Sequence, residues 1–385
     1  MSSARRNLYG LDAGALGEVL TPLGAKPFAG GQISRWLYRQ DAQGFAEMTD
    51  VALSLRLRLD EEFTLARPAI AARFPSLDGT VRYLIDLPGG GQVEAVAIVD
   101  RGRHTFCISS QVGCALACTF CMTGTLGLIR HLTSGEIIGQ VAALMRDRQL
   151  EANHFNLVFM GMGEPLHNYD NVVTALRVLT SSDGFAIGAK RITLSTAGMA
   201  PEIERLARES ARPRLALSLS ATTDEARSRL VPINRRYPLA RLREACLVWK
   251  QETGEQVFLE YVLLAGENDS VEDARRLAAL SRGIAERINL IPFNETPVLP
   301  HRATAFSEIL SFRDEVARRG IRVSIRRSRG RDVAGACGML AFAASPKSDS
   351  TEACFAETAS VRAPSARSAS ARAADSHETS PGGAA

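Results

Sequence analysis

Hydrophobic and polar positions change their period along the chain, and these changes divide it into parts. Over about the first 70 residues, stretches such as "DAGALGEVLTPLG" and "ISRWLYRQ" place apolar residues at helical spacing. After Pro75 the period becomes two, because "TVRYLIDL", a run of glycines and "QVEAVAIV" follow each other as in a β-hairpin. "HTFCISS" then predicts a third strand. We therefore expect a small helical unit followed by a sheet.

From residue 133 to about residue 328, short apolar runs alternate with amphipathic stretches. The runs are "FNLVFMG", "RITLSTAG", "RLALSLSA", "VFLEYVLLAG", "RINLIPFN" and "VSIRRS". Between them, helix starts are indicated by Thr133 with Glu136, by Thr222 with Glu225, and by Ser270 with Asp273. Strands that are apolar along their whole length are typical of a parallel sheet covered on both faces. The pattern predicts an α/β fold of about six β–α steps, with functional side chains at the strand ends.

The composition changes again from about Ala344. The stretch "SARSASARAADSHETSPGGAA" is rich in Ala, Ser and Pro and has almost no large apolar side chains, so it cannot form a core. We expect an N-terminal helical accessory domain at 1–75, a core with a leading hairpin at 76–343, and a disordered tail at 344–385. Cys354, in that tail, is interpreted as an incidental surface thiol.

Overall composition limits the class of protein but says little about its binding partners. With 385 residues, 45% of them hydrophobic, the chain can bury a large core. The 46 basic and 42 acidic residues give a net charge of only +4, which says little about partners. The first residues contain no unbroken apolar signal segment, and no run of about 18 apolar residues occurs. We expect a cytoplasmic protein without a membrane partner.

Three cysteines lie close together in "GCALACTFC", namely Cys114, Cys118 and Cys121, in a chain with seven cysteines. In a reducing compartment such a group binds metal or performs redox chemistry more often than it forms disulfides. Structural zinc needs four protein ligands, and only His104 and His131 are nearby candidates for a fourth. Three thiolates on a four-iron cluster would instead leave one iron open to a reactant.

A glycine-rich turn, "VFMGMGEPL", ends the second apolar run of the core. It lacks the spacing of a phosphate loop or of a dinucleotide-binding turn. Gly163 permits close backbone approach, and Glu164 offers an acceptor for an ammonium group. Taken alone, such a turn is structural more often than functional.

The cysteine spacing after a first strand resembles the radical S-adenosylmethionine (radical SAM) superfamily. Further motifs, in order, are similar to the RlmN/Cfr family of RNA methyltransferases, and most similar to its RlmN branch: "FCISSQVGCALACTFC", "VFMGMGEPLHNYDNVVTAL", "RITLSTAG", "RLVPINRRYPL", "NLIPFNE" and "RRSRGRDVAGACGML". The resemblance extends to about Leu340. It implies a partial (β/α)6 radical SAM barrel and methylation of adenine C2 in the peptidyl-transferase loop of 23S rRNA and beside the anticodon of tRNA. Methylation at C8 is the alternative.

The resemblance also implies roles for individual cysteines and one glutamate. Cys114, Cys118 and Cys121 would hold a [4Fe-4S] cluster, and two SAM molecules would be used per turnover. Cys337 would carry the methyl group as S-methylcysteine, and Cys107 would resolve it through a transient disulfide. Glu94 would accept the ring proton. Without the resemblance, Cys107 and Cys337 would each be interpreted as a buried structural residue, as Cys246 is. Glu94 would be interpreted as a surface residue.

For the cofactor, the matching residues are Gly163, Glu164, Ser195, Ser218, Leu219, Ser220 and Asn294. Ser220 stands where the family usually has histidine, so the chain departs from the family pattern at this position. The partners implied are 23S rRNA, tRNA, an electron donor and a disulfide reductant, with the enzyme a monomer. Candidate phosphate contacts are Arg326, Arg327, Arg329, Arg331, Arg235, Arg236, Arg35, Arg39, Arg56 and Arg58.

Two other classes share part of this pattern. A radical SAM enzyme that acts on a protein would need the cysteine triplet but neither Cys107 nor Cys337. A zinc-containing RNA-binding protein would need the basic patches and no iron.

Overall fold

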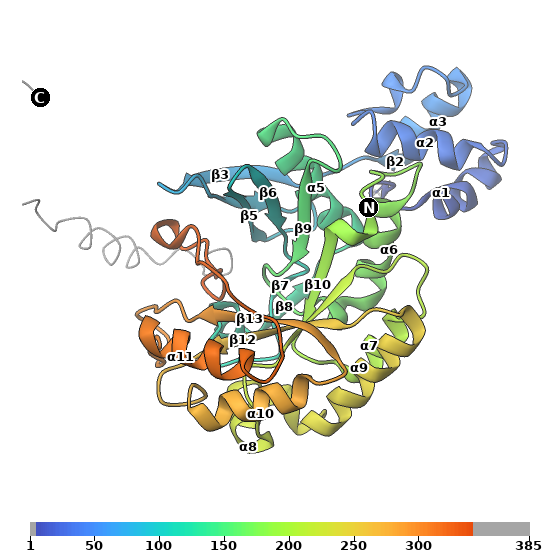
Figure 1. Cartoon of the computed structure of the whole chain (residues 1–385). Coiled ribbons are helices and arrows are strands. Elements are labelled where there is room, and N and C mark those ends of the chain that lie inside the picture. Colours follow the sequence, from blue (N-terminus) through green and yellow to red (C-terminus); the bar gives the residue numbers. More distant parts are fainter. Residues whose placement is uncertain (1–4, 342–385) are drawn as a thin grey trace, which may run out of the picture. The chain divides into compact units, whose positions relative to one another are not determined.

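A ten-stranded mixed sheet organises the chain in a computed structural model that describes residues 5–341 (Figure 1). The strand order is β14-β13-β12-β11-β10-β9-β6-β5-β4-β3. The parallel strands are β6 (Arg103–Cys107), β9 (Phe155–Phe159), β10 (Ile192–Thr196), β11 (Arg214–Ser218), β12 (Val257–Leu263), β13 (Ala285–Pro292) and β14 (Val323–Ile325). The antiparallel strands are β3 (Ala69–Pro75), β4 (Val81–Asp86) and β5 (Gln92–Asp100).

Helices connect the parallel strands, so neighbours in the sheet are also neighbours in the chain. They are α5 (Ser134–Arg148), α6 (Tyr169–Thr180), α7 (Ala200–Leu206), α8 (Asp224–Leu230), α9 (Leu239–Thr253), α10 (Val271–Ser281) and α11 (Phe306–Ala317). Short 3-10 helices occur at Pro165–Asn168, Ala189–Arg191, Pro232–Arg235 and Arg331–Val333. Buried strand residues such as Leu194 and Leu259 form the core. The predicted α/β fold with a partial barrel is therefore confirmed, and the sheet stays open at β14 and β3.

The helix starts show how sequence signals fix local structure. Thr133 accepts a hydrogen bond from the Glu136 N–H, and Glu136 accepts one from the Thr133 N–H, as the sequence predicts. At α10 the Ser270 hydroxyl accepts from the Asp273 N–H and donates to the Asp273 carboxylate. The predicted start at Thr222 is wrong by one residue: Thr223 caps α8, whereas the Thr222 hydroxyl donates to Asp273.

The antiparallel end of the sheet contains a strand that the sequence pattern did not predict. β3 pairs with β4, so the sheet begins at Ala69, within the stretch 1–75 assigned to the helical unit. β3 is an edge strand in which half-buried positions alternate with exposed ones, but exposed Ala69 and Ala71 are apolar too, so the period of two is hard to recognise in "AIAARFP". The predicted tail, 344–385 with Cys354, lies outside the described residues.

The N-terminal part contains β1 (Arg6–Asn7), α1 (Ala13–Leu20), 3-10 turns at Thr21–Leu23 and Phe45–Glu47, α2 (Ala29–Tyr38), α3 (Leu53–Glu62) and β2 (Phe63–Thr64). It is anchored to the core by specific contacts. Arg35 forms a 2.8 Å ion pair with Asp183, which follows α6. At the start of α5, the Ser134 hydroxyl donates to the Gly10 carbonyl at 2.8 Å. None of the described helices is long and apolar enough to span a membrane.

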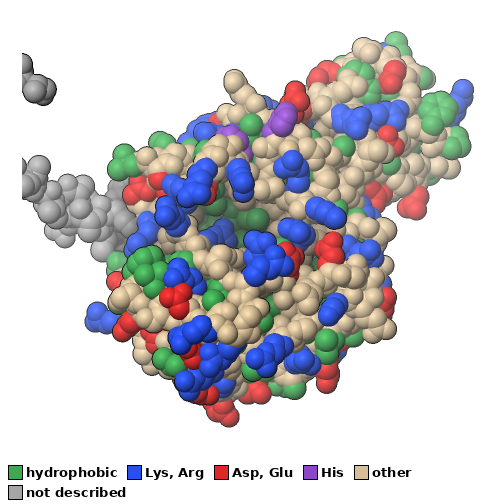
Figure 2. Space-filling model, in the orientation of Figure 1, with side chains coloured by type: hydrophobic (Ala, Val, Ile, Leu, Met, Phe, Trp, Pro, Cys, Tyr) green, Lys and Arg blue, Asp and Glu red, His purple; other side chains and the backbone are tan. Residues whose placement is uncertain are grey.

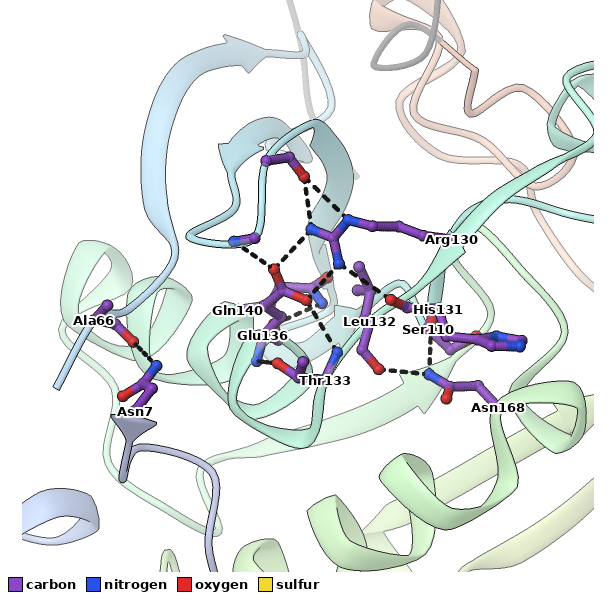
Figure 3. A network of polar contacts seen from close by, with 12 residues as sticks. Asn7, Ala66, Ser110, Arg130, His131, Leu132, Thr133, Glu136, Gln140 and Asn168 are labelled. Atoms are coloured by element: carbon purple, nitrogen blue, oxygen red, sulfur yellow. Dashed lines mark hydrogen bonds and ion pairs between the residues drawn. The ribbon is translucent and has the colours of Figure 1, made fainter. Parts of the chain in front are cut away.

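A polar network fixes the segments on either side of the cysteine loop (Figure 3). This loop lies between β7 (Gln111–Gly113) and β8 (Leu128–His131) and contains the short helix α4 (Met122–Thr125). Arg130 on β8 forms a 2.7 Å ion pair with Glu136 of α5, and Glu136 also accepts from the Gly89 N–H at 3.0 Å. Asn168 donates to the carbonyls of Ser110 and Leu132 at 2.8 and 2.7 Å. The base of the loop is therefore held by three separate parts of the fold.

Candidate active site at the carboxyl ends of the parallel strands

A cavity lies at the carboxyl ends of the parallel strands and contains most of the residues that the sequence singled out. Those lining it are Cys114, Cys118, Cys121, Gly163, Glu164, Ser195, Ser218, Asn294 and Cys337. Parallel strands bring their carboxyl ends to one edge, so residues distant in sequence meet there. Leu219 and Ser220 are buried but do not line the cavity.

The three thiols of the cysteine loop face one wall of this cavity. Partial burial raises the pKa of Cys114 to about 12 and also raises the pKa values of Cys118 and Cys121. Within residues 5–341, no three Cys, His, Asp or Glu side chains converge as the ligands of a single metal ion would. A four-iron cluster instead binds each thiolate at a different iron, so its ligands are spread around a space. Three thiols around a shared cavity fit that kind of centre.

The glycine-rich turn after β9 forms the adjacent wall because its backbone approaches neighbouring segments closely. Gly163 has φ +100°, and a Cβ there would lie 2.5 Å from the Cβ of Gln111. The Glu164 N–H donates to the Gln111 side chain at 2.7 Å. The Glu164 carboxylate accepts from the N–H groups of Leu166 and Ala197 at 3.1 and 2.8 Å. Burial raises the pKa of Glu164 to about 7.

A row of polar side chains crosses the inner face of the sheet beside these walls. Ser218, Glu260 and Asn289 are register partners on β11, β12 and β13. The Asn289 amide donates to one oxygen of Glu260 at 2.8 Å, while the other oxygen has no hydrogen-bond partner among the described residues. The Oδ1 of Asn294 is similarly unsatisfied. Unsatisfied buried acceptors at a cavity fit a ligand with hydroxyl or amino donors, and SAM carries both.

The sequence reading missed Glu260 and a second charged residue, Arg227. Glu260 stands alone as a charge in the apolar run "VFLEYVLL", which was the available signal. Arg227 is fully buried on α8 and donates to the carbonyls of Ala197 and Leu219 at 2.6 and 3.0 Å. The sequence signal for the burial of Arg227 was its position three residues before Leu230, which places the arginine on the same helix face as an apolar residue. Arg227 fixes the loops that follow β10 and β11.

Cys337 is held against the cavity by contacts from two directions. The Asn294 amide donates to the Cys337 carbonyl at 3.0 Å. The N–H of Met122, next to the last cysteine of the loop, donates to the Gly338 carbonyl at 2.8 Å. The segment with Cys337 is therefore attached both to the cysteine loop and to the end of β13.

A second cavity lies on the other side of Cys337. It is lined by Ile98, Asp100, Arg101, Cys107, Met160, Ile291, Ile325, Arg326, Arg327, Ser328, Arg329, Gly335, Ala336, Cys337 and Leu340. Cys107, at the end of β6, is buried, and this burial raises its pKa to about 12. Cys337 thus belongs to the walls of both cavities, whereas Cys107 belongs to the second alone.

Glu94 lies on β5 and is buried. Without the family resemblance, a glutamate on this strand is expected at the surface. Its carboxylate forms an ion pair with Arg82. Side chains alternate along a strand, so Glu94 faces the same side as Ile98, which lines the second cavity. Glu94 itself lines neither of the two cavities.

Two family models match the chain. The radical SAM superfamily matches residues 108–278, and the ribosomal RNA large subunit methyltransferase N-terminal domain matches residues 6–65. The dual-specificity RNA methyltransferase RlmN of Pelobacter propionicus is 44% identical over 87% of this chain and 96% of its own length. That of Geobacter sulfurreducens is 46% identical over 87% of this chain and 91% of its own length. The chain belongs to the RlmN family.

A solved structure supports this membership. The radical SAM methyltransferase from Sphaerobacter thermophilus is 42% identical and has a TM-score of 0.80, over 87% of this chain and 99% of that one. The chain is therefore a radical SAM RNA methyltransferase, and its family implies a [4Fe-4S] cluster and SAM. The predicted family, fold and enzyme class are confirmed.

A member of the RlmN family must bind RNA, and basic side chains surround a hollow with an apolar floor on the face drawn in Figure 2. Arg327 and Arg331 are exposed, as expected for phosphate contacts. Arg35 differs, because it pairs with Asp183. Arg326 also differs from its expected surface role: it is partly buried and lines both cavities.

Proposed function

We propose that this enzyme methylates C2 of an adenine in RNA by way of a methyl group carried on Cys337. The observation that carries the proposal is the position of Cys337 in the wall between two cavities. The first cavity is lined by the cysteine triplet and by Ser218 and Glu260 of the polar row, which suit the cofactors. The second contains Cys107 and several arginines, which suit a base and its phosphates. A group carrier between donor and acceptor needs this placement.

In the first cavity, Cys114, Cys118 and Cys121 would bind three irons of the cluster. Glu164 would accept from the amino group of SAM, and Ser195, Ser218 and Asn294 would bind its hydroxyls and carboxylate. When bound, SAM supplies a methyl group from one molecule and a 5′-deoxyadenosyl radical from a second. Leu219 and Ser220 would contribute only from behind the cavity wall, where the Leu219 N–H already donates to the Glu260 carbonyl.

In the second cavity, Cys337 would first take up the methyl group on its sulfur and then lose one hydrogen atom from that methyl. The methylene radical adds to the adenine ring, since this ring carbon is electrophilic and does not attack a methyl donor itself. Glu94 would accept the ring proton. The unpaired electron of the adduct would pass back to the cluster. The Cys107 thiolate would then attack the Cys337 sulfur, forming the S–S bond as the S–C bond to the product breaks, and the released carbon would take a proton from solvent. An external thiol reductant would return both cysteines to thiols.

The substrates we propose are an adenine of the peptidyl-transferase loop of 23S rRNA and the adenine beside the anticodon of tRNA. The base must leave its stack to bring its ring carbon to Cys337. We further propose a cytoplasmic monomer that receives electrons from a separate donor protein. A C8 product would identify the alternative reaction, which uses the same residues.

The Cys337→Ala variant tests the proposal. It should abolish methyladenosine formation and retain reductive cleavage of SAM, because the cluster ligands are unchanged. Cys246→Ala, which removes a buried thiol in α9, is the matched control and should retain both activities. Methylation by the Cys337→Ala variant would refute the carrier role. Iron-dependent SAM cleavage without RNA methylation by the unaltered enzyme would favour a protein substrate, and zinc without iron would favour a binding protein.

A further inference from the structure

Arg326 extends from the last strand into the interior of the barrel. Its N–H donates to the Leu290 carbonyl at 2.8 Å, which continues the pairing of β14 with β13 by one residue. Ser324, on the same face of β14, is the register partner of Asn289 in the polar row. Arg326 therefore points toward that row, whereas the next residue, Arg327, is exposed.

The guanidinium of Arg326 connects strands that are not neighbours in the sheet. Its Nη1 lies 3.4 Å from the sulfur of Met160, which follows β9. In the strand order, β13, β12, β11 and β10 separate β14 from β9, so this contact crosses the open side of the barrel. Arg326 also lines both cavities, as Met160, Ile291 and Cys337 do. Its charge is therefore placed at the boundary between the two proposed binding spaces.

The charge of Arg326 has no carboxylate partner within ion-pair distance in residues 5–341. The groups around it are the Cys337 thiol, the buried Glu260 carboxylate and the Cys107 thiol, which together keep its pKa above the usual range. Burial raises the pKa of Glu260, so the carboxylate offers this cation less negative charge than an exposed one would. A partly buried guanidinium is stabilised by an anion nearby. Apart from Glu260, the groups that shift the Arg326 pKa are the thiols of Cys337 and Cys107, and each thiol can become an anion.

We propose that Arg326 is a positioning residue for the thiol pair, and that its guanidinium stabilises the thiolate of Cys107 beside Cys337. This inference rests on the roles proposed above for these two cysteines. The thiolate, not the thiol, attacks sulfur or carbon. Arg326 would therefore set the rate of the step in which Cys107 releases the product.

The surroundings of Cys107 explain why a cation is needed. Its burial disfavours the thiolate, and the neighbouring Cys337 thiol disfavours it further. The opposing contributions come from Arg326 and from the Met160 backbone N–H. From β5, the register partner of Cys107 is Val96, which carries no charge. Within residues 5–341, Arg326 is thus the one cation among the groups that shift the Cys107 pKa.

The experiment measures how fast iodoacetamide alkylates Cys107 between pH 7 and pH 10, by peptide mass spectrometry of the anaerobic, cluster-loaded, full-length enzyme. Arg326→Gln should raise the pKa of Cys107 by about one or more. Each increase of one in this pKa reduces the thiolate fraction, and so the alkylation rate, about tenfold. Arg326→Lys keeps the charge and should restore most of the rate. Arg322→Gln is the matched control, since Arg322 is exposed and lines neither cavity, and it should leave the rate unchanged.

Cys246, buried in α9, reports in the same spectra on the intactness of the fold. An unchanged Cys107 rate in Arg326→Gln, with Cys246 also unchanged, overturns the inference. If Cys246 becomes reactive in Arg326→Gln, then Arg326→Lys decides: a Cys107 rate near that of the unaltered enzyme supports the inference, and a loss as large as in Arg326→Gln overturns it. Failure of the proposed function is a separate result, because it would appear as an absence of methyladenosine with the unaltered enzyme.

Discussion

The side-chain amide of Asn294 donates a hydrogen bond of 3.0 Å to the carbonyl of Cys337. Asn294 is a cofactor-binding candidate, and Cys337 is the proposed methyl carrier. Asn294 thus lines the first cavity, its Oδ1 has no hydrogen-bond partner among the described residues, and its Nδ2 holds the backbone of the carrier. Occupancy of the first cavity and the position of Cys337 are expected to be coupled through this residue.

Replacement of Asn294 by alanine tests this coupling. The variant should lose about 1 kcal/mol of unfolding free energy, as expected for one buried hydrogen bond, and remain folded. Methylation of Cys337, followed by the intact mass of the enzyme after incubation with SAM, should fall at least tenfold. Thr296→Ala, two residues away, is the control and should be methylated normally. Equal methylation of Asn294→Ala and the unaltered enzyme would contradict the coupling.

Removal of one cluster ligand should remove the iron. Cys118→Ala leaves two of the three thiols of the cysteine loop, so the anaerobically reconstituted variant should lose most of its iron and its brown colour. Iron analysis and the visible spectrum measure this directly. Cys246→Ala removes a thiol outside the cavity and should keep its full iron content. Full iron binding by Cys118→Ala would show that the cluster has other ligands.

The glycine-rich turn should not tolerate a side chain at Gly163. An added Cβ would lie 2.5 Å from the Cβ of Gln111, on a backbone with φ +100°. Gly163→Ala should therefore lose about 2–4 kcal/mol of unfolding free energy and bind SAM weakly. Gly254→Ala is the control, since Gly254 has φ +73° but no atom within 4 Å of the added Cβ. Its loss should be about 1 kcal/mol, with unchanged SAM binding. Equal losses in urea unfolding would contradict the steric argument.

Asp78 attaches the segment that leads to Cys337 to the turn between β3 and β4. Its carboxylate accepts from the N–H groups of Gly330 and Thr80 at 2.9 and 3.0 Å. Burial opposes ionisation, but these hydrogen bonds outweigh it and lower the pKa of Asp78 from 3.8 to about 2. Because the folded-state pKa is depressed, the resulting stability is present above pH 4 and is lost as pH falls toward 2.

Asp78→Asn should therefore be less stable than the unaltered enzyme at pH 7, by about 1 kcal/mol because solvent screens this exposed group. The difference should shrink as pH falls below 4 in urea unfolding experiments. Asp170→Asn, which removes an exposed carboxylate paired with Arg205, is the control and should show a smaller difference at pH 7. A difference for Asp78→Asn that is constant from pH 7 to pH 3 would contradict the assigned ionisation.

The parts of this molecule that could be predicted from sequence are those set by local patterns. Apolar runs predicted the parallel strands, and the cysteine triplet and the glycine-rich turn predicted two walls of one cavity. β3 was missed because alanines also occupy exposed positions of this edge strand and obscure its period of two. Arg326 was assigned to a basic surface run, since the sequence does not show that β14 aims it across the barrel. Glu260 was missed because its importance depends on register partners on two other strands.

The most direct test of the central claim is nucleoside analysis of ribosomal and transfer RNA after reaction with SAM that carries a trideuterated methyl group. A route through Cys337 removes one hydrogen from the carried methyl and replaces it from solvent. The account predicts 2-methyladenosine with two deuterons in the new methyl group, and one deuteron in 5′-deoxyadenosine. A methyladenosine that keeps all three deuterons, or an absence of methyladenosine, would contradict it.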